Sequence, residues 1–217
     1  MKRLVDEKKS LEKLSREEQA RKDILATMRS LVERYGYHKI TLDDIAKSLG
    51  KTKGFLYYYY PDKDAILEAA IEAESLAMQN EIDIAISKEV TGIAKIRAFI
   101  LVCHLEIQKR QSLLSKLRGE VQSMEGRGVL GILLDKSGEF MKMDAPILKT
   151  LLEIGIKDGS LRSLKGGKLE AVAYMISTIL HGIEYDYIMD KATEHNEKRI
   201  RLAIEALEHG IANPRNP

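Results

Sequence analysis

The sequence predicts an all-α protein built from two domains of unequal size. Over most of the 217 residues, apolar side chains recur at spacings of three and four, as in amphipathic helices, and few runs resemble β-strands. Near the N-terminus two short helical segments flank a glycine, which is the pattern of a helix-turn-helix. We therefore expect an N-terminal three-helix domain with a helix-turn-helix, followed by a larger helical domain.

The composition is typical of a globular protein. Hydrophobic residues make up 44% of the chain and charged residues 31%, with four prolines and no tryptophan, which disfavours a disordered or fibrous chain. Cys103 is the single cysteine and cannot form an intrachain disulfide, and no secretory leader is expected. The longest uncharged stretch, residues 171–183, is too short to span a membrane. We therefore expect a cytoplasmic protein without a transmembrane helix.

Positive charge is concentrated near the N-terminus. Residues 1–60 carry 14 Lys and Arg against 9 Asp and Glu, whereas the remaining residues carry 21 against 24. A basic N-terminal segment is common and decides little by itself. Next to a helix-turn-helix, an excess of Lys and Arg favours binding to the phosphates of DNA, because it releases counterions from the duplex.

Two segments precede the helix-turn-helix. Residues 1–15 are expected to form a frayed or disordered arm, because their few leucines lie among mixed charges. The basic side chains of this arm either stay solvated or reach DNA. Ser15 and Glu18 form a capping-box pattern that opens a helix, and Gly36 ends it. The three-helix domain is expected to span residues 16–61.

The first motif helix has clear signals at both ends. Thr41 is expected to cap it, and Ile45 and Ala46 lie on its apolar face. Gly50 ends the helix, because a glycine readily takes the positive φ that a helix C-terminus needs.

The second motif helix follows at once. Thr52 is expected to cap it, and Leu56 and Tyr60 share its inward face. Pro61 ends the helix, and Asp62 caps a long helix that connects the two domains without a flexible linker. The residues left pointing outward are Gly54, Phe55, Tyr57 and Tyr58.

Residues 62–217 are expected to form the larger domain, in which helix boundaries between residues 119 and 145 stay open. Its two last helices, near residues 168–189 and 194–209, are apolar over broad faces. They could close the core of one chain or pair with their symmetry mates in a homodimer, and we favour the homodimer. The residues expected at this interface are Val172, Met175, Ile179, Ile183, Ile200, Ile204 and Leu207.

Residues 16–80 resemble the TetR family of bacterial transcriptional repressors. In that family a Thr opens the first motif helix, Ile-Ala lies within it and a Gly starts the turn. Gly-x-Leu-Tyr-x-x-aromatic, followed by a Lys, marks the recognition helix. The residues that match are Thr41, Ile45, Ala46, Gly50, Gly54, Leu56, Tyr57, Tyr60 and Lys63. The sequence departs from the pattern at Lys51, Thr52 and Tyr60, where a small apolar residue, Ser and Phe are common.

The resemblance implies a homodimeric repressor that binds double-stranded DNA. A two-fold dimer would place two recognition helices in successive major grooves about 34 Å apart, so the operator is expected to be palindromic. Phosphate contacts are expected from Thr41, Thr52, Tyr57 and Lys63. Contacts to base edges are expected from Lys53, Gly54, Phe55 and Tyr58.

The later helices resemble the ligand-binding and dimerisation domain of that family in layout only. An apolar small molecule in this domain would release the operator. Most residues that could line its pocket are more typical of an ordinary core; they are Met78, Phe99, Cys103, His104, Met124, Phe140, Met141 and Met175. The alternative is a ligand-independent dimeric DNA-binding protein that acts through DNA occupancy or a protein partner.

Catalytic and metal-binding patterns are weak. No nucleophile, glycine-rich phosphate loop or pair of acids stands out, and Cys103, His104 and Glu106 lack the spacing of a helical metal pair. We therefore expect neither enzyme activity nor a cofactor or metal.

Overall fold

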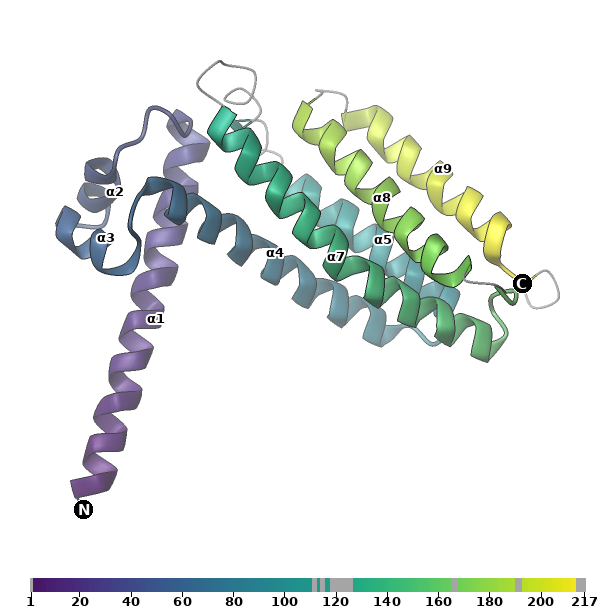
Figure 1. Cartoon of the computed structure of the whole chain (residues 1–217), viewed down its shortest axis with the longest axis horizontal. Helices are drawn as coiled ribbons and strands as arrows, with labels where there is room; N and C mark the ends of the chain where they lie inside the picture. The colour runs from purple at the N-terminus through teal and green to yellow at the C-terminus, as the bar shows by residue number, and fades with distance from the viewer. Residues whose placement is uncertain are drawn as a thin grey trace. The chain divides into compact units, whose positions relative to one another are not determined.

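The structure, a computed structural model, describes residues 2–110, 113, 116–117, 127–164, 168–189 and 193–213. Its helices (Figure 1) are α1 Lys2–Tyr35, α2 Leu42–Ser48, α3 Lys53–Tyr59, α4 Lys63–Lys88, α5 Gly92–Lys109, α7 Arg127–Asp158, α8 Lys168–Met189 and α9 Thr193–Ile211. Within these ranges there is no β-strand, and a single isolated bridge joins Leu161 to Ala212. The all-α prediction is confirmed.

The chain divides into two compact units, residues 1–73 and 74–217, which we call unit 1 and unit 2. The division falls inside α4, whereas the sequence suggested a boundary after residue 61. Polar contacts explain the difference, because the first turn of α4 is bonded to the loop between α1 and α2. Lys63 donates hydrogen bonds to the carbonyls of Tyr37 and Ile40, and Tyr37 donates one to the Asp64 carboxylate.

Unit 1 has a core to which each of its helices contributes apolar side chains. Its fully buried members are Ile24, Met28, Val32, Ile45, Leu56 and Ile66. α1 ends where Gly36 takes a φ of 84°, and the Gly36 amide still bonds to the Val32 carbonyl at 2.9 Å. A side chain would be strained at this φ, so the glycine fixes the point where the chain leaves α1.

The arm expected over residues 1–15 is helical, because α1 begins at Lys2. This segment contains neither Gly nor Pro and is rich in Leu, Glu, Lys and Arg, which have high helix propensity. Ser15 therefore lies inside α1 and does not begin it. Figure 1 shows the first turns of α1 extending past α2 and α3 within unit 1.

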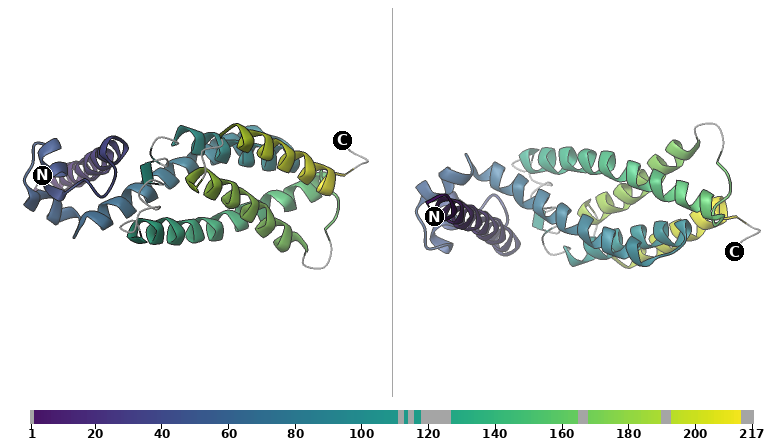
Figure 2. Two further views of the ribbon diagram at one scale, coloured as in Figure 1. Left: turned by 90° about the horizontal axis from the view of Figure 1, so that it is seen from above. Right: turned by 90° about the horizontal axis from the view of Figure 1, so that it is seen from below.

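Unit 2 is a bundle of α5, α7, α8 and α9 with the second half of α4, arranged around one apolar core (Figure 2). Side chains that this core buries almost completely include Ile82, Ile96, Phe99, Leu148 and Leu152. α5 and α7 meet backbone to backbone, because a Cβ atom on Gly92 would lie only 2.2 Å from the nitrogen of Gly155. The Gly92 amide also donates to the Asp158 carboxylate at 2.7 Å, which fixes this end of the bundle.

α7 is one continuous helix from Arg127 to Asp158, with Pro146 inside it. A proline is typical of the first turn of a helix, and a helix start at Pro146 would have been expected from its residue type alone. The residues on both sides of the proline explain why the helix continues. Asp144 is buried and bonds to His181 of α8, and Leu148 is buried in the core of unit 2. These contacts offset the loss of one backbone hydrogen bond at the proline.

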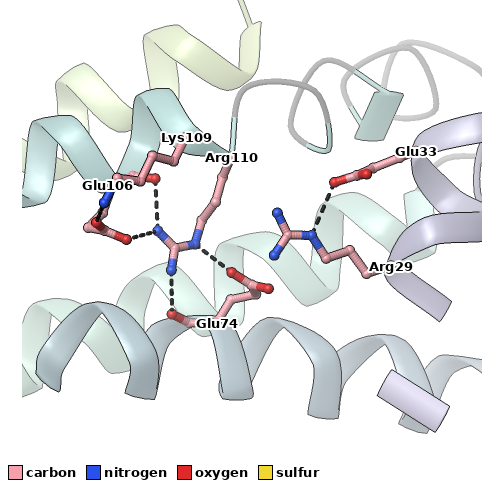
Figure 3. A network of polar contacts seen from close by, with 6 residues as sticks. All are labelled: Arg29, Glu33, Glu74, Glu106, Lys109 and Arg110. Carbon is pink, nitrogen blue, oxygen red and sulfur yellow. Dashed lines mark hydrogen bonds and ion pairs between the residues drawn. The ribbon is translucent and has the colours of Figure 1, made fainter. Parts of the chain in front are cut away.

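Arg110 joins the C-terminal end of α5 to α4 (Figure 3). Its guanidinium donates to the carboxylates of Glu74 and Glu106, each at 2.7 Å, and to the backbone carbonyls of the same two residues. Only 14% of the Arg110 side chain is exposed. Burial acts to raise the pKa of Glu106, but hydrogen bonds from Lys109 and Arg110 outweigh it and hold that pKa below its usual range.

Arg110→Met should lower the free energy of unfolding by about 2–4 kcal/mol, because two partly buried carboxylates lose their shared cation. Arg97→Met on the same helix is a matched control. Arg97 pairs with Glu208 at 2.6 Å, but half of its side chain is exposed, so its loss should cost less than about 1 kcal/mol. Urea denaturation followed by far-UV circular dichroism measures both values. Equal losses would show that the contact between α4 and α5 is an ordinary surface pair.

Candidate nucleic-acid interface

The start of α2 is fixed by a reciprocal cap. The Thr41 hydroxyl accepts a hydrogen bond from the Asp44 amide at 3.2 Å, and the Asp44 carboxylate accepts one from the Thr41 amide at 2.8 Å. Hydrogen bonds from the Thr41 hydroxyl and amide lower the pKa of Asp44. The predicted cap at Thr41 is confirmed, and it holds an exposed hydroxyl at the N-terminus of α2.

The turn between α2 and α3 follows the predicted geometry. Gly50 has a φ of 64°, and the Lys51 amide returns to the Ala46 carbonyl at 2.9 Å. Lys51, which departs from the family pattern, does not disturb this turn. Its side chain is exposed, and its ammonium lies 5.4 Å from the centre of the Phe55 ring.

α3 begins at Lys53 as predicted, although the Thr52 hydroxyl makes no capping hydrogen bond. Gly54 has an ordinary helical backbone without a positive φ, and a Cβ there would touch only the Thr52 hydroxyl, at 3.8 Å. The packing of unit 1 therefore does not require glycine at this position. A glycine on an exposed helix face allows another molecule to approach the backbone closely.

The side chains of the four consecutive tyrosines, residues 57–60, divide between the core and the surface of unit 1. Leu56 and Tyr60 are buried, as predicted, whereas the side chains of Tyr57 and Tyr58 are 53% and 67% exposed. Phe55 is half-buried, because its ring packs edge-on against Tyr59 with 5.1 Å between centroids. Two of the aromatic side chains expected to face outward, Tyr57 and Tyr58, are therefore exposed on α3, and Phe55 offers only part of its ring.

Two residues of the exposed face have acidic partners in unit 1. The Lys53 ammonium pairs with the Asp43 carboxylate of α2 at 3.1 Å, and this hydrogen bond raises the pKa of Lys53. The Tyr58 hydroxyl donates to the Glu17 carboxylate of α1, also at 3.1 Å. Sequence inspection did not find Asp43 or Glu17, because these contacts join residues on different helices.

Lys63 has a structural role that the sequence did not suggest. Its ammonium donates to the carbonyls of Tyr37 and Ile40 at 3.1 and 3.0 Å, and it lies 4.0 Å from the centre of the Tyr37 ring. Burial and the hydrogen bond to Asp64 raise the pKa of Tyr37. In the structure, Lys63 therefore holds the segment before Thr41 and does not project from the surface as a free cation.

Arg21 is a further basic residue that the sequence analysis missed. Its guanidinium lies 5.3 and 5.4 Å from the ring centres of Tyr59 and Tyr60, and it donates to the Tyr59 carbonyl at 3.5 Å. α1 thereby supports the C-terminal end of α3. The only available signal was its position on a helix expected to pack near the motif.

The residues suggested for a ligand pocket do not form one group. Phe99, Cys103 and His104 are buried in α5, and Met78 packs against the same core. Burial lowers the pKa of His104. Met175 instead lies on an exposed face of α8. Met124 and the side chains of Phe140 and Met141 lie outside the described part of the chain.

The residues suggested for a dimer interface also divide. Met175 and Ile179 are exposed, and Val172 and Ile183 are partly buried against the core of unit 2. The remaining three, which this core buries within a single chain, are Ile200, Ile204 and Leu207. On α9 the large exposed apolar side chain is Leu202.

A buried polar group lies between α7 and α8. His181 Nε2 and the Asp144 carboxylate are 3.1 Å apart, and both side chains are almost fully buried. One turn earlier on α8, the Ser177 hydroxyl is fully buried and has no hydrogen-bond partner among the described residues. The sequence alone did not reveal this group, because Asp144 and His181 lie on different helices, 37 residues apart in the chain.

Two further findings apply only to the residues that the structure describes. No group of three or more His, Cys, Asp or Glu side chains is arranged to hold a metal ion. No helix is long and apolar enough to cross a membrane.

Comparison with known proteins agrees with the helix-turn-helix. Residues 24–70 match the family model described as bacterial regulatory proteins, tetR family. The HTH-type transcriptional regulator EthR of Mycolicibacterium smegmatis is 39% identical over 49 residues, which are 23% of each protein. The match therefore spans about a quarter of that relative's length.

Two solved structures share the fold over nearly the whole chain. A transcriptional regulator from Cytophaga hutchinsonii has a TM-score of 0.68 at 22% identity, with 87% of this chain and 96% of that one covered. A regulator from Saccharomonospora viridis in complex with choline has a TM-score of 0.64 at 18% identity, with 90% and 98% covered. Residues 24–70 therefore match the DNA-binding domain of the tetR family, and the solved structures show that the chain shares their all-helical fold.

Proposed function

We propose that the protein is a cytoplasmic homodimeric repressor that binds a palindromic operator and is released by a small molecule. The exposed face of α3 carries this proposal. Gly54 has no packing reason to be glycine, and the side chains of Tyr57 and Tyr58 beside it are exposed. Such a face suits close approach to a major groove, with hydroxyls for phosphates and rings for thymine methyl groups.

The proposed contacts divide into positioning and reading. Thr52 and Tyr57 offer exposed hydroxyls to phosphates at the start and along the face of α3. Thr41 donates its hydroxyl to the Asp44 carboxylate at 2.6 Å, so a phosphate contact there requires this bond to be exchanged. The side chains proposed to read base edges are those of Lys53, Phe55 and Tyr58, beside the backbone of Gly54. Lys63 acts mainly by holding the loop that positions Thr41, with any phosphate contact secondary.

Two substitutions distinguish the phosphate contact proposed for Tyr57 from the structural role proposed for Lys63. Their DNA affinity is measured on an operator duplex that the wild-type protein has selected from a random library. Tyr57→Phe should weaken operator binding about three- to tenfold without lowering the melting temperature, since only one hydrogen bond is lost. Lys63→Met should lower the free energy of unfolding by about 1–2 kcal/mol and weaken binding with an unchanged salt dependence. Fluorescence anisotropy at several salt concentrations measures both. A salt slope smaller by about one for Lys63→Met would instead assign that side chain to a phosphate.

The homodimer is supported by an apolar face that the core of unit 2 leaves uncovered. Tyr174, Met175 and Ile179 are 40–57% exposed on α8, and Leu202 is exposed on the neighbouring α9. Small residues such as Gly182 lie on the same side of α8 and allow close helix packing. A second copy applied by a two-fold axis would bury this face against itself.

Ile179→Asp should raise the dimer dissociation constant at least about 100-fold, because a charge would be buried at the interface. Ile84→Asp on α4 is a matched control, since the two isoleucines are 40% and 41% exposed. Sedimentation velocity over a concentration series measures the dimer fraction. A dimer that tolerates Ile179→Asp would place the interface elsewhere.

Response to a ligand is supported by the polar group between α7 and α8. A fully buried hydroxyl without a partner costs about 1–3 kcal/mol, and a ligand that bonds to Ser177 would recover this energy. The nearby pair of His181 and Asp144 could bond to the same ligand. We therefore propose an amphiphilic ligand with a hydrogen-bonding group on an apolar body, which refines the purely apolar ligand expected from sequence. Choline is included among the probes below, because the regulator from Saccharomonospora viridis with a similar fold was solved in complex with choline.

Ser177→Ala should stabilise the ligand-free protein by about 1 kcal/mol, because an unsatisfied hydroxyl is removed. The same substitution should reduce the rise in melting temperature that a ligand produces. Thermal-shift measurements with choline, octylamine, octanol and octanoate compare the two proteins. If the wild-type protein binds its operator but responds to none of these probes, the ligand-independent alternative is favoured.

A further inference from the structure

Two of the side chains proposed to read DNA are held by carboxylates in the same domain. Lys53 of α3 pairs with Asp43 of α2, and Tyr58 of α3 donates to Glu17 of α1, with 3.1 Å between the bonded atoms in each case. All four residues belong to unit 1. Negative charge therefore lies directly beside a face that is proposed to meet a polyanion.

Asp43 lies in the first turn of α2, where a carboxylate favours the positive end of the helix dipole, but neither Asp43 nor Glu17 caps a helix or joins a buried network. The cap of α2 is formed by Asp44, so Asp43 is not needed for it, and the Asp43 side chain is 71% exposed. An exposed ion pair such as Asp43 with Lys53 contributes little to stability. Glu17 also pairs with Lys13, one turn earlier on the same helix at 3.8 Å.

The effect of these carboxylates differs between random DNA and an operator. On random DNA, binding depends mainly on phosphate contacts, and each carboxylate repels phosphates and competes for the donor that it holds. On an operator, Lys53 and Tyr58 leave Asp43 and Glu17 to bond with base edges, which compensates for the lost contacts. The carboxylates thus weaken random binding more than operator binding.

We propose that Asp43 and Glu17 are specificity determinants, which suppress binding to non-operator DNA by holding Lys53 and Tyr58 in the free protein. This inference rests on the proposed contacts of α3 with an operator. It assigns a function to two acidic residues that would otherwise be unfavourable in a DNA-binding surface.

The test uses the isosteric variants Asp43→Asn and Glu17→Gln, which remove charge but keep a hydrogen-bond acceptor. Glu18→Gln is the matched control, because Glu18 is on the same helix and pairs with Lys22 along α1 at 2.9 Å instead of with α3. Fluorescence anisotropy is measured with the selected operator duplex and with a scrambled duplex of equal length and composition. Thermal unfolding checks that each variant is folded.

Each of the two variants should bind the scrambled duplex about three- to tenfold more tightly, with a salt slope that is larger by up to about one. Operator affinity should change less than about twofold, so the ratio of the two affinities falls. Glu18→Gln should leave this ratio unchanged. Asp43→Glu, which restores the charge, should return the ratio toward the wild-type value.

Equal tightening on both duplexes would overturn the inference, since it would indicate only long-range electrostatics. No change on either duplex would also overturn it and reduce the two contacts to structural links between helices. If the wild-type protein enriches no sequence from the random library, the proposed operator binding itself fails, which is a distinguishable result.

Discussion

The structure depends on α4, a single helix that contributes to two separate cores. Ile66 and Leu67 are buried in the part of α4 that belongs to unit 1, and Ile82 is buried in the core of unit 2. Polar contacts hold the helix in both units. Lys63 bonds to loop carbonyls in unit 1, and Glu74, the first residue of unit 2, bonds to Arg110. A change that unfolded or broke α4 would therefore remove buried side chains from the core of each unit.

The helix-turn-helix could be predicted because its signals are local. Thr41 and Asp44 form the cap within one turn, and Gly50 takes the positive φ within the motif itself. The same local reasoning was wrong where a longer context decided the outcome. Residues 2–14 continue α1 because nothing interrupts the helix, and Pro146 lies within α7 because buried neighbours on both sides hold it.

Contacts between helices could not be predicted from one sequence. Lys63 matches a motif position, yet its ammonium is directed at two backbone carbonyls that no spacing rule reveals. Apolar periodicity likewise identified α8 and α9 as broad apolar helices without showing which side faces the chain's own core. Ile204 is buried within the chain and Leu202 is exposed, although the two residues belong to the same helix. Only the positions of the neighbouring helices show which apolar face of α8 or α9 is buried within the chain and which is exposed.

The backbone contact at Gly92 and Gly155 has a consequence for any ligand in unit 2. Two helices that touch at their backbones cannot move closer, and the hydrogen bond from Gly92 to Asp158 resists their separation. This end of the bundle therefore fixes the spacing of α5 and α7. The pair of Asp144 and His181 lies farther along α7, on the side that meets α8. A ligand at the proposed site would therefore shift α8 against α7, while α5 and α7 keep their spacing at the two glycines.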